Sequence, residues 1–207
     1  MEKVDFKKQL KDLYSAKSGT FVEVTVPKFN YLMVDGQGDP NNSQTYANAI
    51  QALYSLSYTL KFMSKEELKK DYVVPALEGL WWADDMSDMT KGNKDKWKWT
   101  AMIMLPDWIT TEMFRRALVE ANSHKPEIDF AQVYKDQLRE GKCVQTMHIG
   151  PYSEEAKTIA KLHQEYLPQH HLRPVGKHHE IYLSDPRRVP PEKLRTIIRQ
   201  PVGAQAK

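Results

Sequence analysis

The order of apolar segments and turn signals repeats along the chain, and this repeat constrains the fold more than any other feature. Each half has an extended segment, a glycine turn, a helix with a serine N-cap, and two further extended segments. The order strand, helix, strand, strand, found twice, predicts an α+β fold with helices on one side of an antiparallel sheet. The segments are Tyr31–Val34, Gly36, the helix from Ser43, Leu80–Ala83 and Trp97–Leu105, and then Cys143–Ile149, Gly150, the helix from Ser153, His179–Leu183 and Leu194–Gln200.

The repeat also predicts the domain organisation. A chain of 207 residues that is 41% hydrophobic can bury one core. We expect a single domain over residues 1–207, with module one at about residues 20–122 and module two at about residues 128–202. Two such modules side by side would create a groove, which Trp81-Trp82 and Glu180-Tyr182 would approach from opposite walls.

Proline and capping residues predict where individual elements begin and end. Phe21–Val26 alternates in polarity and meets Pro27, which predicts that one strand ends there and a second begins at Phe29. The first long helix is expected to start near Asn42 or Ser43, which both have the side chains of N-cap residues, and Thr110 is the expected cap of a later helix.

The helix of the second module is expected to begin after Ser153 as its N-cap, with Glu154 and Glu155 in the first turn. We expect its buried stripe to comprise Ala156, Ile159, Ala160, His163 and Tyr166, with His163 as a half-buried packing residue.

Composition excludes several classes of protein. The single cysteine, Cys143, cannot form an internal disulfide or a cysteine zinc cluster, and it suits a reducing compartment. The net charge of +3 is spread along the chain, so no direct nucleic-acid binding is expected. No apolar run approaches the ~20 residues of a membrane helix, so we expect a soluble, cytoplasmic protein with no membrane contact.

Motifs for metals and nucleotide cofactors are lacking in the sequence. Adjacent histidines such as His178-His179 diverge on a strand, and no zincin spacing, P-loop, dinucleotide turn or nucleophile elbow occurs. We therefore expect neither a metal nor an organic cofactor.

The segment His178–Pro186 is the best candidate for chemistry. On a strand, Ile181 and Leu183 would face one side, while His178, Glu180 and Tyr182 would face the other. A glutamate between a histidine and a tyrosine is unusual on a strand, so we expect Glu180 to face a pocket with aromatic walls. The alternative is that Glu180 lies on the solvent face of an antiparallel sheet.

Aromatic residues of the first half provide candidate ligand contacts. Only one of the adjacent Trp81 and Trp82 can enter the core of a strand, so the other should face a cleft that binds something flat, or lie beneath a loop. Trp97 on the return strand is a further candidate. Tyr54 and Tyr58, one helical turn apart, could line the cleft or form the rim of ordinary core packing.

Several segments resemble the GyrI-like small-molecule-binding proteins, from about residue 20 to about residue 202. The resemblance implies two β-α-β-β modules that form a pseudo-symmetric sheet with a central ligand cleft. It also implies an acidic cleft residue at Glu180 and aromatic walls from Trp81, Trp82, Tyr152 and Tyr182. The segments that carry it are Leu77–Trp82, Glu140–Gln145, His148–Tyr152, Glu180–Leu183 and Asp185-Pro186.

The resemblance also suggests functions. The same fold is the drug-sensing domain of multidrug-responsive transcription activators, but residues 1–20 are too short for a helix-turn-helix reader, which indicates a stand-alone binder or enzyme. Some stand-alone members hydrolyse the strained cyclopropane of flat DNA-alkylating natural products. In such a reaction Glu180 would be the general base, and Tyr182 or Tyr152, with His178 as a further candidate, would protonate the carbonyl oxygen.

The sequence also allows two functions other than catalysis. The same residues could form a binding module that holds a flat cation by cation–π contact and charge pairing. A protein-binding inhibitor of a topoisomerase is the third reading. The expected ligand is a small, planar, hydrophobic or cationic molecule, and the oligomeric state stays open, with a homodimer among the alternatives.

Overall fold

The computed structural model describes residues 3–85 and 87–205. The chain forms two compact units. The first comprises the residues up to 9 together with Phe29–Leu138, and the second comprises Leu10–Lys28 together with the residues from 139 on. The boundary between the units falls within two long strands, β2 (Val22–Gln37) and β6 (Tyr134–Ile149).

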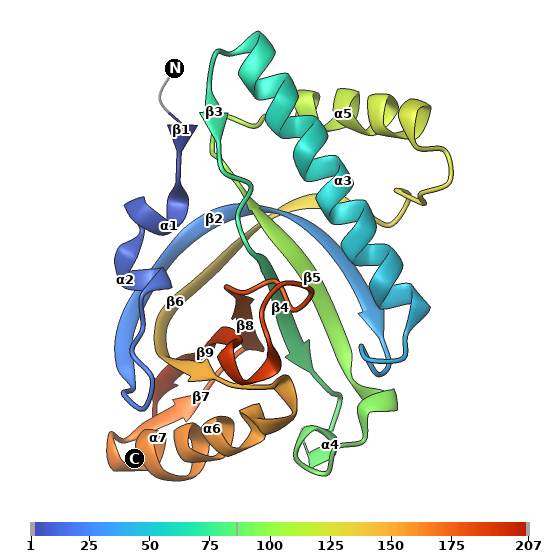
Figure 1. Ribbon diagram of the computed structural model, residues 1–207. Coiled ribbons are helices and arrows are strands. Elements are labelled where there is room, and N and C mark those ends of the chain that lie inside the picture. Colours follow the sequence, from blue (N-terminus) through green and yellow to red (C-terminus); the bar gives the residue numbers. More distant parts are fainter. Residues whose placement is uncertain (1–2, 86, 206–207) are drawn as a thin grey trace. The chain divides into compact units, whose positions relative to one another are not determined.

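The first unit is a three-stranded antiparallel arrangement with two long helices (Figure 1). Strand β5 (Lys98–Leu105) pairs with β2 on one side and with β4 (Leu77–Trp82) on the other. Helix α3 (Gln44–Glu67) packs against β5 and against α5 (Thr111–His124). The short elements are β1 (Lys3–Val4), α1 (Phe6–Gln9), β3 (Asp71–Tyr72), α4 (Ser87–Thr90) and η1 (Lys94–Lys96).

Both predicted N-caps of the first unit are confirmed. The Ser43 hydroxyl accepts a hydrogen bond from the Tyr46 backbone N–H at 3.2 Å, at the start of α3. The Thr110 hydroxyl accepts one from the Met113 backbone N–H at 3.1 Å, at the start of α5. Each bond satisfies a backbone donor that has no partner within the first turn of a helix.

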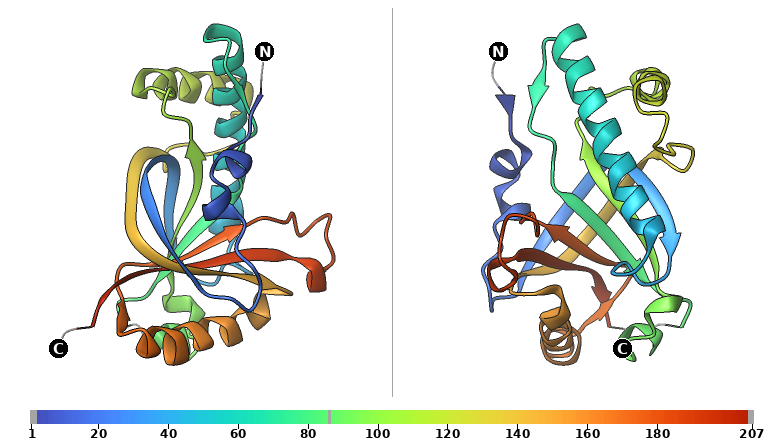
Figure 2. Two further views of the ribbon diagram at one scale, coloured as in Figure 1. Left: turned by 90° about the vertical axis from the view of Figure 1, so that its left-hand side faces the viewer. Right: turned by 45° about the vertical axis from the view of Figure 1, so that its right-hand side comes forward.

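The second unit is built around β9 (Arg195–Ala204), which pairs antiparallel with β6, with β8 (His178–Tyr182) and with β7 (Leu172–Pro174). Helices α6 (Glu155–Lys161) and α7 (Leu167–Gln169) lie along one face of these strands (Figure 2). The remaining elements are α2 (Lys11–Tyr14), the 3₁₀ helices η2 (Tyr152–Glu154) and η4 (Pro191–Lys193), and the π-helix η3 (Leu162–Tyr166).

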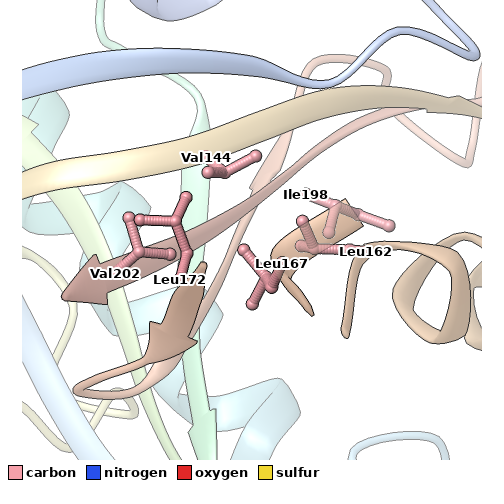
Figure 3. Close-up of a cluster of buried hydrophobic side chains, with 6 residues drawn as sticks. All are labelled: Val144, Leu162, Leu167, Leu172, Ile198 and Val202. Atoms are coloured by element: carbon pink, nitrogen blue, oxygen red, sulfur yellow. The ribbon is translucent and has the colours of Figure 1, made fainter. Parts of the chain in front are cut away.

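An apolar cluster joins η3 and α7 to the strands β6, β7 and β9. Figure 3 shows side chains from β6, β7 and β9 meeting side chains from η3 and α7. All six side chains are buried. Burying apolar surface stabilises a fold by about 25 cal/mol per Å², so the cluster is a principal source of stability for the unit. Its members are Val144, Leu162, Leu167, Leu172, Ile198 and Val202.

The α+β class and the repeated β-α-β-β order are confirmed. The first unit contains β2, α3, β4 and β5, and the second contains β6, α6, β8 and β9 in the same order, with antiparallel pairing in each. Within the described residues, no helix has the length and apolar character required to span a bilayer.

The prediction of two strands separated at Pro27 is wrong, because β2 runs through this residue from Val22 to Gln37. The ladder between β2 and β5 begins only at Asn30. Pro27 lies outside that ladder, so its missing N–H removes none of those hydrogen bonds.

The predicted start and stripe of the second helix also need correction. Ser153 lies inside η2, and α6 begins at Glu155 without a side-chain cap. Ala156 is exposed, whereas Glu155 and Leu162 are buried. The observed face runs through Glu155, Ile159 and Leu162, so it keeps the 3.6-residue period but is displaced by one position from the predicted Ala156 and His163. Ile159 and Tyr166 do pack against the apolar cluster.

Trp99 and Gly36 form a close contact at the centre of the first unit. Trp99 of β5 is fully buried, lies opposite Trp81 of β4, and has Gly36 of β2 beneath its ring. A Cβ atom built on Gly36 would lie 2.1 Å from Cζ2 of Trp99. Only a glycine at position 36 therefore leaves room for the Trp99 indole against β2.

We expect Gly36→Ala to destabilise the protein by about 1–3 kcal/mol, because the added methyl group displaces a ring in a packed core. Urea unfolding measures the effect. The control is Gly203→Ala on β9, whose added Cβ would lie 3.3 Å from Val175 Cγ1. Equal stability of the Gly36→Ala variant and the native protein would contradict the role assigned to this contact.

A buried ion network holds β8 and β9 to β6. His179 Nδ1 lies 2.9 Å from Glu140 Oε1, and Arg199 Nη1 donates to Glu140 Oε2 at 3.2 Å. Arg199 also donates to Gln145 Oε1 and to the Leu13 carbonyl oxygen. Burial raises the pKa of the Glu140 carboxyl, but the charges and hydrogen bonds of His179 and Arg199 outweigh it and lower the pKa to about 2.

Replacing Glu140 by Gln should cost about 3–5 kcal/mol at pH 7, because it leaves the buried Arg199 charge without its counter-ion. Since the pKa of Glu140 is lowered on folding, its contribution is complete above the ordinary carboxyl pKa and is lost as the pH falls towards about 2. Unfolding curves at several pH values should therefore show the two proteins converging in acid. Glu23→Gln, which breaks an exposed pair with Lys142, is the control and should cost less than about 1 kcal/mol.

Candidate functional site

Strand β8 presents a hydrogen-bonded triad on one of its faces. The Tyr182 hydroxyl donates to Glu180 Oε2 at 2.7 Å, and His178 Nε2 lies 3.2 Å from Glu180 Oε1. The three residues are two apart along the strand, so their side chains share a face. The Glu180 side chain is only 13% exposed, so the alternative of a glutamate on a solvent face does not describe this residue.

Tyr152 joins this triad from a neighbouring element. It lies in η2, just after the glycine turn at Gly150, and its ring meets the ring of Tyr182 edge to face with centroids 5.7 Å apart. Tyr152 is 37% exposed, so it forms the outer part of the group. The structure thus brings together the four candidates of the second unit that the sequence indicated.

Glu155 is a member of this group that sequence reasoning missed as a site residue. It opens α6 and is only 5% exposed, although no hydrogen-bond partner for its Oε1 exists among the described residues. Burial, and then the nearby charge of Glu180, raise the pKa of Glu155 to about 9, while the Thr196 hydroxyl acts in the opposite direction. At neutral pH the carboxyl group of Glu155 is therefore neutral.

The sequence did contain a signal for Glu155. It precedes Ile159 by four residues and Leu162 by seven, which is the spacing of one helical face. An acid on an apolar face is a candidate for a perturbed pKa, and such residues concentrate at functional sites.

His163 is a second such residue, for which the sequence predicted only a packing role. Burial, and then the charge of His178, lower the pKa of His163 to about 4, so its imidazole is neutral at pH 7. His163 lies within the π-helix η3. Single π-turns inside α-helices often occur at functional sites, because they reorient a side chain without breaking the helix.

Two further polar atoms near Glu180 are buried without a hydrogen bond in the described part of the chain. They are Nδ1 of His178 and the hydroxyl oxygen of Thr196. Thr196 lies on β9 directly opposite Tyr182, so it belongs to the same face as the triad. Together with Glu155 Oε1, they give this region three buried polar atoms that can still form hydrogen bonds.

Trp81, an aromatic candidate of the first unit, has the rings of Tyr46 and Trp97 as neighbours. Trp81 is 4% exposed, and its ring lies 5.8 Å from that of Tyr46 and 6.1 Å from that of Trp97. Trp82 is partly exposed. The expectation that one tryptophan of the pair enters the core agrees with this arrangement.

The two tyrosines of α3 differ in exposure. Tyr54 is half-buried, whereas Tyr58 is 48% exposed and its ring lies 6.5 Å from that of Phe62. That these tyrosines and the tryptophans share one cleft with Glu180 stays a prediction.

In residues 3–85 and 87–205, no group of three or more His, Cys, Asp or Glu side chains is arranged to hold a metal ion. Cys143 is buried, and burial raises the pKa of its thiol to about 12, so it is not a reactive thiolate.

The two units, each with the β-α-β-β order, and the acidic, aromatic site define a class of small-molecule-binding domain. The chain belongs to the GyrI-like small molecule binding domain family, whose model matches residues 20–202. A comparison with curated proteins finds no match.

Solved structures provide similar proteins. An uncharacterized conserved protein from Listeria innocua is 44% identical, with a TM-score of 0.89, and the match covers 97% of this chain and all of that one. A hydrolase from Listeria innocua is 42% identical, with a TM-score of 0.85 and the same coverage of both chains. The EcmrR C-terminal domain is 9% identical, with a TM-score of 0.56 over 89% of this chain and 98% of that one, and shares the fold alone.

We expect Glu155→Gln to stabilise the protein at neutral pH. A carboxyl whose pKa is raised to about 9 on folding costs stability as the pH rises above its ordinary value, because the unfolded chain releases the proton and the folded chain retains it. The variant should therefore gain up to about 3 kcal/mol at pH 7, and the gain should shrink towards pH 4. Urea unfolding at both pH values measures it, with the exposed Glu154→Gln as control; a gain that does not depend on pH would contradict the assignment.

Proposed function

We propose that this protein binds small planar molecules and hydrolyses the strained cyclopropane ring of flat DNA-alkylating compounds. The observation that carries the proposal is the 2.7 Å hydrogen bond from the Tyr182 hydroxyl to the Glu180 carboxylate in a nearly buried site. Addition of water to such a ring requires a general base and a general acid, and these two side chains can supply both. The 42% identity to a hydrolase from Listeria innocua over 97% of the chain supports this choice.

The reaction can be written with these two residues. Glu180 takes a proton from water while the water oxygen forms a bond to a cyclopropane carbon. The ring C–C bond breaks, and its electron pair passes through the conjugated dienone to the carbonyl oxygen. Tyr182 gives its proton to that oxygen, which yields a phenol and an alcohol. The proton on Glu180 then returns to Tyr182 along their hydrogen bond, and this restores the starting state.

The surrounding residues support these roles. His178 contacts the second oxygen of the Glu180 carboxylate at 3.2 Å and so restricts its rotation. The ring of Tyr152 packs against the ring of Tyr182 and so restricts the direction in which the Tyr182 hydroxyl points. Because ring strain already lowers the barrier, a contribution of about 10²–10⁴ from acid and base catalysis is sufficient. The mechanism requires neither a metal nor an organic cofactor.

A second candidate function is the binding of planar cations without turnover. Within the described chain, the ion pairs of Glu180 involve His178 and neither Lys nor Arg. Its negative charge is therefore available to a cationic ligand next to the aromatic rings of Tyr152 and Tyr182. This candidate shares the ligand site with the hydrolase and differs from it only in the chemical step.

Glu180→Gln should abolish turnover of a cyclopropane-bearing alkylator, with a loss of at least about 10²-fold, because an amide cannot accept the proton of water. The change of alkylator absorbance with time measures turnover, and calorimetry measures binding. Glu154→Gln, which alters an exposed acid, is the matched control and should retain full activity.

The native protein itself decides between the two functions. Binding of the alkylator without any change in its absorbance would overturn the hydrolase and favour sequestration. Unchanged turnover in Glu180→Gln would overturn the role of Glu180.

A further inference from the structure

The buried polar atoms beside Glu180 suggest which ligands the site selects. Glu155 Oε1 and His178 Nδ1 are buried and have no hydrogen-bond partner within the described residues. The Thr196 hydroxyl is buried as well and lies near the Glu155 carboxyl, whose pKa it lowers, but it forms no hydrogen bond of normal length there. A buried polar group without a partner costs about 1–3 kcal/mol, and native proteins leave few of them unpaired. Such atoms beside one carboxylate indicate a place where polar atoms of another molecule complete the hydrogen bonds.

We propose that the carboxyl group of Glu155, with the hydroxyl of Thr196, donates a hydrogen bond to a carbonyl oxygen of the ligand, so that the site selects planar ketones. This inference rests on the proposed small-molecule site, and it assigns a substrate class and a substrate-contacting role to Glu155 that the mechanism above does not use.

The chemistry of the donors excludes other ligand groups. A protonated carboxyl and a hydroxyl both offer O–H donors, and a ketone oxygen is an acceptor only, so the two match. A ligand carboxylate or phosphate would meet the negative charge of Glu180 and be repelled. A ligand with an apolar group at this position would leave Glu155 and Thr196 without partners.

The donor role requires the proton on Glu155. Because burial and the charge of Glu180 raise the pKa of Glu155 to about 9, the carboxyl is a donor at pH 7 and becomes an acceptor-only carboxylate well above pH 9. Glu180 of β8 and Thr196 of β9 act on Glu155 directly. Tyr182 and His178 contact Glu180, Tyr152 packs on Tyr182, and His148 of β6 lies opposite Thr196. His163 of η3 is reached by the charge of His178.

The test compares two uncharged, planar probes of nearly the same shape, 9-fluorenone and fluorene, which differ in the carbonyl group. Equilibrium dialysis measures the dissociation constant of each for the full chain at pH 7 and pH 10, with circular dichroism to verify folding. We expect the native protein to bind the ketone about fivefold to tenfold more tightly at pH 7, the size expected for one hydrogen bond. This preference should be lost at pH 10.

Three variants isolate Glu155. Glu155→Gln keeps an N–H donor that does not titrate, so its ketone preference should persist from pH 7 to pH 10. Glu155→Leu has no donor, so its preference should be lost at both pH values. Glu154→Gln should behave like the native protein.

Equal binding of the two probes by the native protein, or no binding of either, overturns the proposal. The proposal is also overturned if Glu155→Gln loses its ketone preference at pH 10 as the native protein does, because a group other than Glu155 is then the one that titrates. If Glu155→Leu fails to fold, the Gln variant alone still decides. Failure of the hydrolase proposal is a separate outcome, since a ketone preference without turnover of the cyclopropane would leave this assignment intact.

Discussion

The buried contact of Glu140 with Arg199 and His179 is the interaction on which the second unit depends. It joins β6, β8 and β9 on one face of these strands. Because side chains alternate along a strand, fixing His179 on that face also fixes Glu180 on the opposite one. A salt bridge of this kind adds little stability beyond what apolar packing would provide, but its directional hydrogen bonds define one register. The position of the catalytic candidates therefore depends on a network that lies on the opposite face of their strand.

The site itself carries a thermodynamic cost. Glu155 is buried as a neutral acid close to a second carboxyl, and three polar atoms of the region have no partner in the described chain. Each of these features opposes folding. The apolar cluster between η3, α7 and the strands offsets this cost by burying six aliphatic side chains on the same face. Residues that lower stability while other parts of the domain compensate are typical of functional sites.

The sequence predicted those features that depend on local periodicity. Alternation along His178–Tyr182 placed the histidine, acid and tyrosine on one face, and the capping side chains of Ser43 and Thr110 marked two helix starts. Features that depend on tertiary contacts were missed. β2 continues through Pro27, and its ladder with β5 begins only beyond that residue.

Glu155 and His163 were missed for a related reason. Their pKa values are shifted by burial and by the charges of Glu180 and His178, and these charges come close to them only in the tertiary structure. The family resemblance supplied the acid and the aromatic residues of the site, but not the second carboxyl.

The π-helix η3 implies a particular sensitivity to changes of chain length. A π-turn contains one residue more than the α-helical repeat, so removing a single residue from Leu162–Tyr166 would leave a continuous α-helix. Because the extra residue is accommodated within a single turn, such a deletion would leave α6 and α7 close to their present orientations and would mainly re-aim the side chains of the turn itself, His163 among them. Glu155 would keep its buried position. Homologues that differ by a single-residue gap at this turn would thus have the same architecture and the same buried acid, but a different side chain in the place of His163.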